Sequence, residues 1–221
     1  MRNTKPVNGT SFFSTLRTSI YGEDRPSVSK IAEEARDPFR VLVSTIISSR
    51  TKDEVTLQAA ERLFAAAATP RDLAELTEQQ IAEYIYPAGF YTTKAGNLRK
   101  TAEVLLRDFG GKVPPVLEEL LKLPGVGRKT ANLVLNLGFA IPAICVDTHV
   151  HRIVNRTGFV ATKQPNETER ELMKALPEQY WIEINELLVS FGKKVCMPQS
   201  PFCSTCPFSA DCPKIGVKKH R

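Results

Sequence analysis

Residues 123–135, which read LPGVGRKTANLVL, decide the fold of this chain. An apolar helical segment ends at the first leucine, and the PGVG of residues 124–127 is compatible only with a tight turn. A second helix is predicted from residue 128 to about residue 137, because apolar positions then recur at helical spacing. The stretch is therefore a helix, a glycine turn and a helix, with a basic pair directly behind the turn.

The glycine turn has the features of a phosphate site. Glycine has no Cβ, so a ligand can approach the backbone closely, and the amides and dipole of the following helix attract an anion. A nucleotide-binding P-loop does not fit, because Arg128 separates Gly127 from Lys129 and the preceding element is a helix. Two interpretations stay open. One is a structural turn with a glycine C-cap, and the other is a helix–hairpin–helix that holds a nucleic-acid backbone without reading its sequence.

The rest of the chain is also predicted to be helical. The first segment carries apolar side chains at helical spacing: Phe12, Phe13, Leu16 and Ile20. Further helices are expected at 38–49, 53–67, 70–86 (one or two helices), 92–109, 116–123, 148–157, 166–175 and 178–193. The segment 38–49 is apolar nearly all round and is therefore expected to be buried. No strand pattern and no internal repeat is visible, so the predicted fold class is all-α.

The composition is that of a globular protein with a basic balance. The 221 residues suffice for one large domain or two small ones. The net charge of +6 suits an anionic partner such as nucleic acid, although many basic proteins bind none. No segment is apolar for long enough to span a membrane, and the first residues lack the apolar core of a secretion signal. We expect a cytoplasmic protein whose five cysteines are thiols or metal ligands, not disulfides.

Lys129 is a candidate nucleophile. It lies in the first turn of the second helix, where the dipole disfavours a cation, so local stability does not explain it. The same field favours the uncharged amine, which can form a Schiff base with the anomeric carbon of a sugar. Asp147 precedes another expected helix, and its simplest role is an N-cap. A carboxylate in the same cleft as Lys129 could instead activate the amine or stabilise positive charge on a sugar.

Four cysteines near the end of the chain follow the pattern C-x6-C-x2-C-x5-C: Cys196, Cys203, Cys206 and Cys212. Four thiolates suit a structural zinc ion or an iron–sulfur cluster. Zinc sites usually show two close cysteine pairs, whereas this proline-rich loop has one, so a cluster is favoured. The fifth cysteine, Cys145, lies in an apolar run and is expected in the core. His149 and His151 face different ways on a helix and are expected to pack or hydrogen-bond.

The stretches LPGVGRKTANLVLN and VDTHVHRIVNRTGF, followed by this cysteine pattern, closely resemble the endonuclease III family of the helix–hairpin–helix (HhH-GPD) superfamily. The resemblance runs from about Ile31 to Cys212. It implies two all-α domains with a cleft between them. A six-helix barrel domain that carries the hairpin is expected at 30–141. Residues 1–29 plus 142–221 are expected to form a helical domain with a [4Fe–4S] loop, whose cluster is structural or DNA-sensing in this family.

The resemblance also implies a function. The family contains base-excision-repair DNA glycosylases with abasic-site lyase activity, which remove oxidised or ring-saturated pyrimidines from duplex DNA. The damaged base is flipped out of the stack, a lysine displaces it and forms an imine, and β-elimination then cleaves the strand. Lys129 and Asp147 match the family's catalytic pair, and the four tail cysteines match its cluster ligands. The expected partner is double-stranded DNA with a damaged pyrimidine or an abasic site, bound by a monomer.

The DNA-contacting positions carry over from the family in the same way. They are Leu123, Gly125, Val126 and Gly127 of the hairpin, together with Arg50 and Phe90. The family often has glutamine at the position of Arg50, where the side chain would fill the gap left by the flipped base. Phe90 matches an apolar wedge that is often leucine, and an aromatic ring there could stack between bases. Packing of Phe90 in the core is the alternative.

Two other functions compete with this interpretation. A monofunctional adenine or mismatch thymine or uracil glycosylase would share the fold, but such relatives typically lack the lysine after the hairpin. A non-catalytic DNA-binding iron–sulfur protein would need neither Lys129 nor Asp147. The two residues together therefore favour the lyase.

Overall fold

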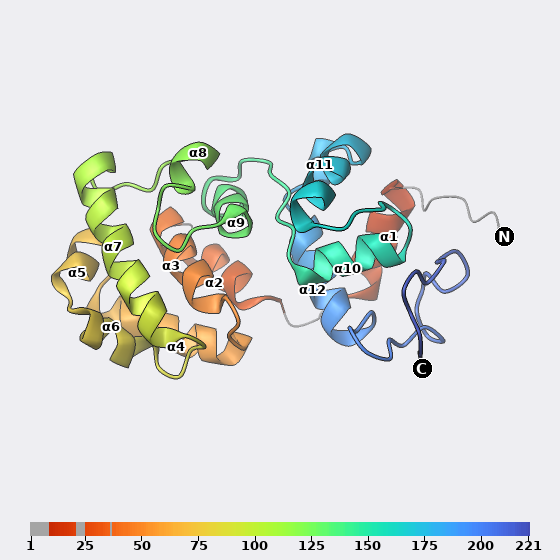
Figure 1. Cartoon of the computed structure of the whole chain (residues 1–221), viewed down its shortest axis with the longest axis horizontal. Coiled ribbons are helices and arrows are strands. Elements are labelled where there is room, and N and C mark those ends of the chain that lie inside the picture. The colour runs from red at the N-terminus through yellow and green to blue at the C-terminus, as the bar shows by residue number, and fades with distance from the viewer. Residues whose placement is uncertain (1–8, 21–24, 36) are drawn as a thin grey trace. The chain divides into compact units, whose positions relative to one another are not determined.

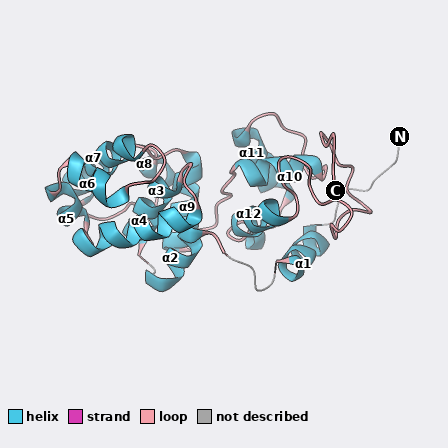
Figure 2. Cartoon of the chain, turned by 90° about the horizontal axis from the view of Figure 1, so that it is seen from below, coloured by secondary structure: helices cyan, strands magenta, loops and turns pink. Residues whose placement is uncertain are grey.

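A computed structural model of the chain describes residues 9–20, 25–35 and 37–221. Every regular element within those ranges is a helix (Figure 2), so the all-α prediction is confirmed there. The chain divides into two compact units, which are Pro26–Ala143 and the combination of Met1–Arg25 with Ile144–Arg221. The division explains why the N-terminal helix shares a core with the last helices rather than with its neighbours in sequence.

The unit Pro26–Ala143 is built around one buried helix (Figure 1). Its helices are α2 (Ser27–Ala35), α3 (Pro38–Ser48), α4 (Asp53–Ala66), α5 (Pro70–Glu75), α6 (Glu78–Ile85), α7 (Tyr91–Phe109), α8 (Leu117–Leu120) and α9 (Arg128–Phe139). The helix α3 is buried along nearly its whole length, as its apolar sequence predicts, and it packs against α2, α4, α7 and α9. A Cβ at Gly138 would lie 3.0 Å from the Cα of Pro38, so a glycine is needed where α9 crosses the start of α3.

Local sequence signals end and begin most of these helices. The segment 70–86 forms two helices because Thr69 and Thr77 each start one with a capping box. The helix α7 ends at Gly110, which has the left-handed conformation expected of a glycine after a helix. The helix α2 was not predicted. Val28, Ile31 and Ala32 are buried at helical spacing, so periodicity could have found it.

The second unit contains α1 (Gly9–Ser19), α10 (Thr148–Arg156), α11 (Pro165–Ala175), the 3₁₀ turn η1 (Glu178–Tyr180) and α12 (Ile184–Lys194). Aromatic side chains join these elements. The rings of Phe13 and Tyr180 stack with 4.3 Å between centres, and Phe12 lies 4.9 Å from Phe208 of the cysteine-rich loop. The prediction of one helix over 178–193 is wrong. Tyr180 turns into the core, and the Trp181 indole donates back to the Leu176 carbonyl, which favours a turn.

No helix among the described residues is long and apolar enough to cross a membrane. Buried Cys145 confirms the core position that its apolar surroundings predict.

Candidate active site

The hairpin joins α8 to α9 through a turn whose side chains face inward. Leu123 and Val126 are buried, so these two residues can offer a ligand only their main-chain groups. The Val126 amide donates to the Leu123 carbonyl at 3.1 Å, and the Thr101 hydroxyl of α7 donates to the Pro124 carbonyl at 2.9 Å. The turn is thus fixed both within itself and to α7.

The two glycines of the hairpin differ in what the fold requires of them. Gly125 has a φ of +76°, and a Cβ there would lie 2.8 Å from the Asn97 amide nitrogen, so the turn needs glycine. Gly127 is the N-cap of α9 with an extended backbone, and a Cβ there would meet nothing within 4 Å. Both residues are exposed. The fold therefore explains the first glycine and leaves the second unexplained.

Lys129 is the second residue of α9, and its side chain is exposed. It belongs to the unit Pro26–Ala143. The helix behind it is anchored firmly, because Ala131, Val134 and Leu135 are buried. The lysine therefore projects from a rigid helix end, next to a turn that exposes backbone.

Asp147 is the N-cap of α10, as the simplest sequence interpretation predicts. Its Oδ1 accepts from the amides of His149 and Val150 at 2.9 and 2.8 Å. Both bonds go to this same oxygen. Oδ1 thus holds the carboxylate in place at the start of α10. Asp147 belongs to the second unit and Lys129 to the first.

Arg50 and Phe90 lie together in the unit Pro26–Ala143, although they come from different loops. The guanidinium carbon of Arg50 is 5.4 Å from the centre of the Phe90 ring. Phe90 is 62% exposed, so its alternative role in the core is wrong. Both residues have a left-handed backbone, with φ of 53° and 58°. Bulky residues rarely adopt this conformation, which makes the pair a candidate functional surface.

The two loops are held together by direct contacts. The Gly89 amide donates to the Thr51 hydroxyl at 3.1 Å, and a Cβ at Gly89 would overlap the Arg50 carbonyl oxygen. The ammonium of Lys94 donates to the carbonyls of Ile47 and Ser49, at 2.6 Å each, and to the Thr51 hydroxyl at 2.9 Å. The position of Arg50 is therefore coupled to the start of α7.

The four tail cysteines line one cavity and are half-buried, with no disulfide between them. Apolar side chains complete the walls, among them Phe191, Phe202 and Phe208. Burial in this cavity, together with the proximity of the other thiols, raises the pKa of Cys206 to about 11. Burial likewise raises the pKa of Cys212. The structure thus gathers the four sulfurs predicted to act together.

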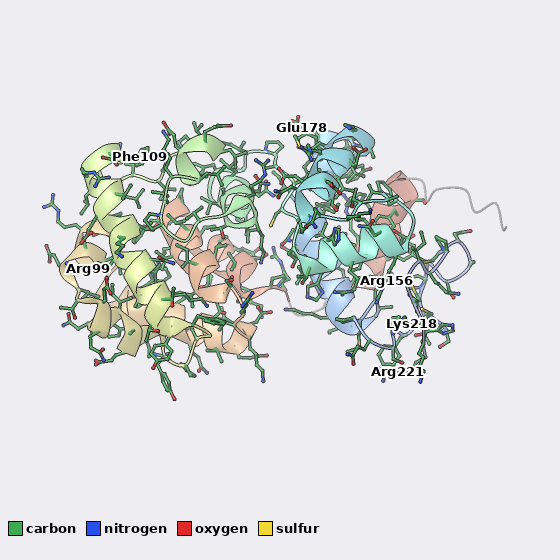
Figure 3. The ribbon with its side chains drawn as sticks, in the orientation of Figure 1. Arg99, Phe109, Arg156, Glu178, Lys218 and Arg221 are labelled. Atoms are coloured by element: carbon green, nitrogen blue, oxygen red, sulfur yellow. The ribbon has the colours of Figure 1, made fainter. Side chains whose placement is uncertain are left out.

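Two arginines of α10 hold this cysteine loop. Arg156 donates to the carbonyls of Met197 and Pro198 at 2.6 and 2.7 Å, and to the sulfur of Cys196 at 3.6 Å. Arg152 donates to the Cys196 carbonyl at 2.9 Å, and burial lowers its pKa. The segment 214–221 lies on the same end of the unit, where Figure 3 labels Arg156 and Arg221. The Arg221 amide donates to the Pro201 carbonyl at 2.8 Å.

The two histidines after Asp147 have structural roles, as predicted. His151 shares a hydrogen bond of 2.6 Å with the Thr168 hydroxyl, and His149 one of 3.1 Å with the Arg152 guanidinium. They are held by separate partners on different faces of α10.

Comparison with known proteins places these sites in a family. The model of the HhH-GPD superfamily of base excision DNA repair proteins matches residues 43–178. A Thermotoga maritima protein described as endonuclease III is 50% identical over 176 residues, which cover 80% of this chain and 83% of that protein. The chain belongs to the endonuclease III family of the HhH-GPD superfamily. The matched range contains both loops, the hairpin, Lys129 and Asp147, and the four tail cysteines follow it.

Solved structures of the endonuclease III family have the same fold. A non-covalent endonuclease III–DNA complex aligns with a TM-score of 0.83 at 32% identity, over 93% of this chain and 94% of that one. A trapped endonuclease III–DNA covalent intermediate, an estranged-adenine complex, aligns with a TM-score of 0.80 at 32% identity, over 94% of this chain and 97% of that one. The resemblance inferred from the motifs is therefore confirmed.

Three contacting residues were missed by sequence reasoning. Lys94 occupies the apolar face of α7, at helical spacing from Leu98, and a lysine in that register is a recognisable signal. Arg152 and Arg156 occupy ordinary positions on an amphipathic helix. Nothing in their local sequence indicates that they contact the cysteine loop some forty residues later.

Proposed function

We propose that this chain is a base-excision-repair DNA glycosylase with an associated abasic-site lyase activity, acting on oxidised or ring-saturated pyrimidines in duplex DNA. The observation that carries the proposal is the exposed Lys129, two residues behind an exposed glycine turn, in a member of the endonuclease III family. We further propose that it acts as a monomer, in the compartment that holds the DNA. The units described above would be the barrel domain and the cluster domain expected from the sequence.

Lys129 supplies the nucleophile in this mechanism. Its Nζ forms a bond to C1′ of the flipped nucleotide as the glycosidic C–N bond breaks, and the base leaves with a proton. Opening of the sugar ring gives an imine. Loss of a C2′ proton then breaks the C3′–O bond, so the 3′ phosphate leaves by β-elimination. Water hydrolyses the imine and frees the lysine. An exposed lysine on a rigid helix end can reach such a carbon only if DNA is held in place.

The glycine turn provides that hold. Glycine is an acceptable N-cap, but serine or aspartate would cap α9 better, so local stability does not favour Gly127. A phosphate that contacts the main chain needs the space that a side chain would fill. The buried side chains of Leu123 and Val126 would anchor the turn in the core, so that its main chain keeps its position when it contacts the phosphate. The contact positions the backbone and carries no base specificity.

Asp147 is the proposed catalytic carboxylate. Its Oδ1 is held by two amides of α10, which fixes the orientation of the group. Its Oδ2 could then accept a proton from the Lys129 ammonium or stabilise the cationic sugar. The same side chain would serve as cap and as catalyst.

A [4Fe–4S] cluster fits the cysteine-lined cavity. Four thiolates are the usual ligand set of such a cluster, and four cysteines line this one cavity. Cys196, Cys203, Cys206 and Cys212 would hold it. The bound cluster would cross-link the cysteine loop or respond to DNA, and it would take no part in hydrolysis.

Borohydride trapping tests the proposed function. Duplex DNA with one abasic site is incubated with the protein and reduced, and covalent adducts are separated by size. We expect an adduct with the wild type and with Lys112→Ala, whose exposed lysine follows α7, and none with Lys129→Ala. Absence of the wild-type adduct would refute the lyase, and an adduct with Lys129→Ala would refute the assigned nucleophile.

A further inference from the structure

Lys94 is a buried cation whose three partners lie at the end of α3 and in the loop after it, which carries Arg50. It lies in α7, and only 6% of it is exposed. Its ammonium donates to the carbonyls of Ile47 and Ser49 and to the hydroxyl of Thr51. An ammonium has three donors, so these contacts satisfy it completely. No carboxylate is among them, and Lys94 therefore does not serve to balance a charge.

The partners of Lys94 surround a strained turn. Arg50 lies between two of them and has a φ of 53°. Its carbonyl oxygen is packed against Gly89, the residue before Phe90, and the Thr51 hydroxyl also accepts from the Gly89 amide. The left-handed conformation of a non-glycine residue persists only where its surroundings hold it. From α7, Lys94 bonds to the residues on both sides of Arg50, and the Thr51 hydroxyl also donates to the Ser49 carbonyl at 3.3 Å.

Burial of this ammonium is costly, which argues against a passive role. Burial lowers the pKa of Lys94 to about 8. A methionine or leucine would pack on the same face of α7 without that cost. A lysine is useful here only for the hydrogen bonds that its head makes with the loop.

We propose that Lys94 is the positioning residue for DNA insertion: it locks the 47–51 turn onto the start of α7, so that Arg50 and Phe90 enter the duplex as one rigid wedge. The inference rests on the proposed function, because it assumes a flipped nucleotide whose gap must be filled. A displaced Arg50 would leave the nucleotide free to return to the stack. Lys94 does not touch the reacting atoms.

Comparison of duplex and single-stranded substrates tests this role. A single strand with an abasic site has no stack to invade, but it needs the same chemistry from Lys129. Single-turnover cleavage is measured on both forms for the wild type, Lys94→Met and Lys100→Met, the last an exposed lysine of α7. We expect the cleavage rate of Lys94→Met to fall about tenfold on the duplex, because small misplacements of a contacting group are costly. On the single strand the rate should fall less than about twofold. Lys100→Met should match the wild type on both.

The same experiment separates this proposal from its premises. Arg50→Ala should show the same duplex-selective loss, and the double variant should be no worse than either single one. The positioning role would be overturned if Lys94→Met lowered the cleavage rate equally on both substrates or on neither. It would also be overturned if the losses of Lys94→Met and Arg50→Ala were additive in the double variant. Thr51→Val is a milder change that removes one partner of Lys94 together with the acceptor of the Gly89 amide. It should also slow cleavage of the duplex more than cleavage of the single strand, which guards against misfolding as the cause of the loss in Lys94→Met. A wild type inactive on both substrates would instead refute the proposed function.

Discussion

The guanidinium of Arg50 lies over the ring of Phe90, with 5.4 Å from its central carbon to the ring centre. A cation–π contact at an exposed site is worth about 0.5–1 kcal/mol. The left-handed backbone at each residue costs a similar amount or more. Stability alone therefore does not account for the arrangement. The pair is better explained as a surface that is held ready for a ligand.

Phe90→Gly should separate stability from activity. Glycine adopts the left-handed conformation without strain, which offsets the lost contact with Arg50. We expect the free energy of unfolding to stay within about 1 kcal/mol of the wild type. Excision from duplex DNA should fall about tenfold, because the proposed wedge is gone. Urea unfolding and single-turnover excision measure the two quantities. Unchanged excision would show that Phe90 does not enter the duplex.

The two hairpin glycines should respond differently to alanine. Gly125→Ala places a Cβ against Asn97 at a φ of +76°, so it should destabilise the fold by about 1–2 kcal/mol. Gly127→Ala meets no neighbour and should cost at most about 1 kcal/mol, as a weaker N-cap. Its affinity for duplex DNA should nevertheless fall about tenfold, because the methyl group keeps a phosphate from the main chain. Thermal unfolding and fluorescence anisotropy with duplex DNA report the two effects. Wild-type affinity in Gly127→Ala would contradict the close approach.

Short-range signals account for what the sequence could predict. The segment 38–49 had to be a buried helix because it is apolar nearly all round, and the capping residues and glycines marked most helix ends. The hairpin was readable because a turn, two glycines and a helix start lie within one stretch of sequence. The break after Tyr180 was not readable, because it depends on where the ring packs in the tertiary core.

Contacts between distant segments are what the sequence did not predict. Arg50 and Phe90 could be named from family resemblance, but their stacking was not predicted. Nor were the bonds of Lys94 to residues more than forty positions earlier, which join the two loops. Arg156 likewise contacts a loop far along the chain. Helical periodicity reports which side chains face the core and carries no information on which distant carbonyl a buried cation will meet.

Asp147→Asn should keep the stability of the fold and lose strand-cleavage activity. Asparagine caps a helix about as well as aspartate, so the free energy of unfolding should change by less than about 1 kcal/mol. The neutral amide cannot accept a proton from Lys129 or stabilise a cationic sugar, so strand cleavage should fall by about a hundredfold or more. Asp147→Ala loses the cap as well and should cost about 1 kcal/mol further. Equal activity of Asp147→Asn and the wild type would leave Asp147 with the capping role alone.

The buried ammonium of Lys94 should make stability depend on pH. Its folded pKa of about 8 lies below the unfolded value of 10.5, so the unfolded state binds more protons between these values. The free energy of unfolding, relative to that of Lys94→Met, should therefore rise with pH across this window, by about 2 kcal/mol up to pH 9.5. This gain should be lost again as the pH falls to 8. Parallel urea unfolding of both proteins from pH 7 to 9.5 measures the difference. A flat difference would mean that Lys94 has an ordinary pKa.

Arg156→Met should loosen the cysteine loop without unfolding the protein. The guanidinium makes three contacts with residues 196–198, whereas methionine can only pack with its aliphatic part. We expect a purified protein with less bound iron, weaker visible absorbance and faster loss of colour in the presence of a chelator. Arg170→Met, which changes an exposed arginine of α11, is the matched control and should resemble the wild type. If Arg156→Met keeps its iron as long as the control does, the cluster is held by its cysteines alone and the contacts from α10 do not stabilise the loop.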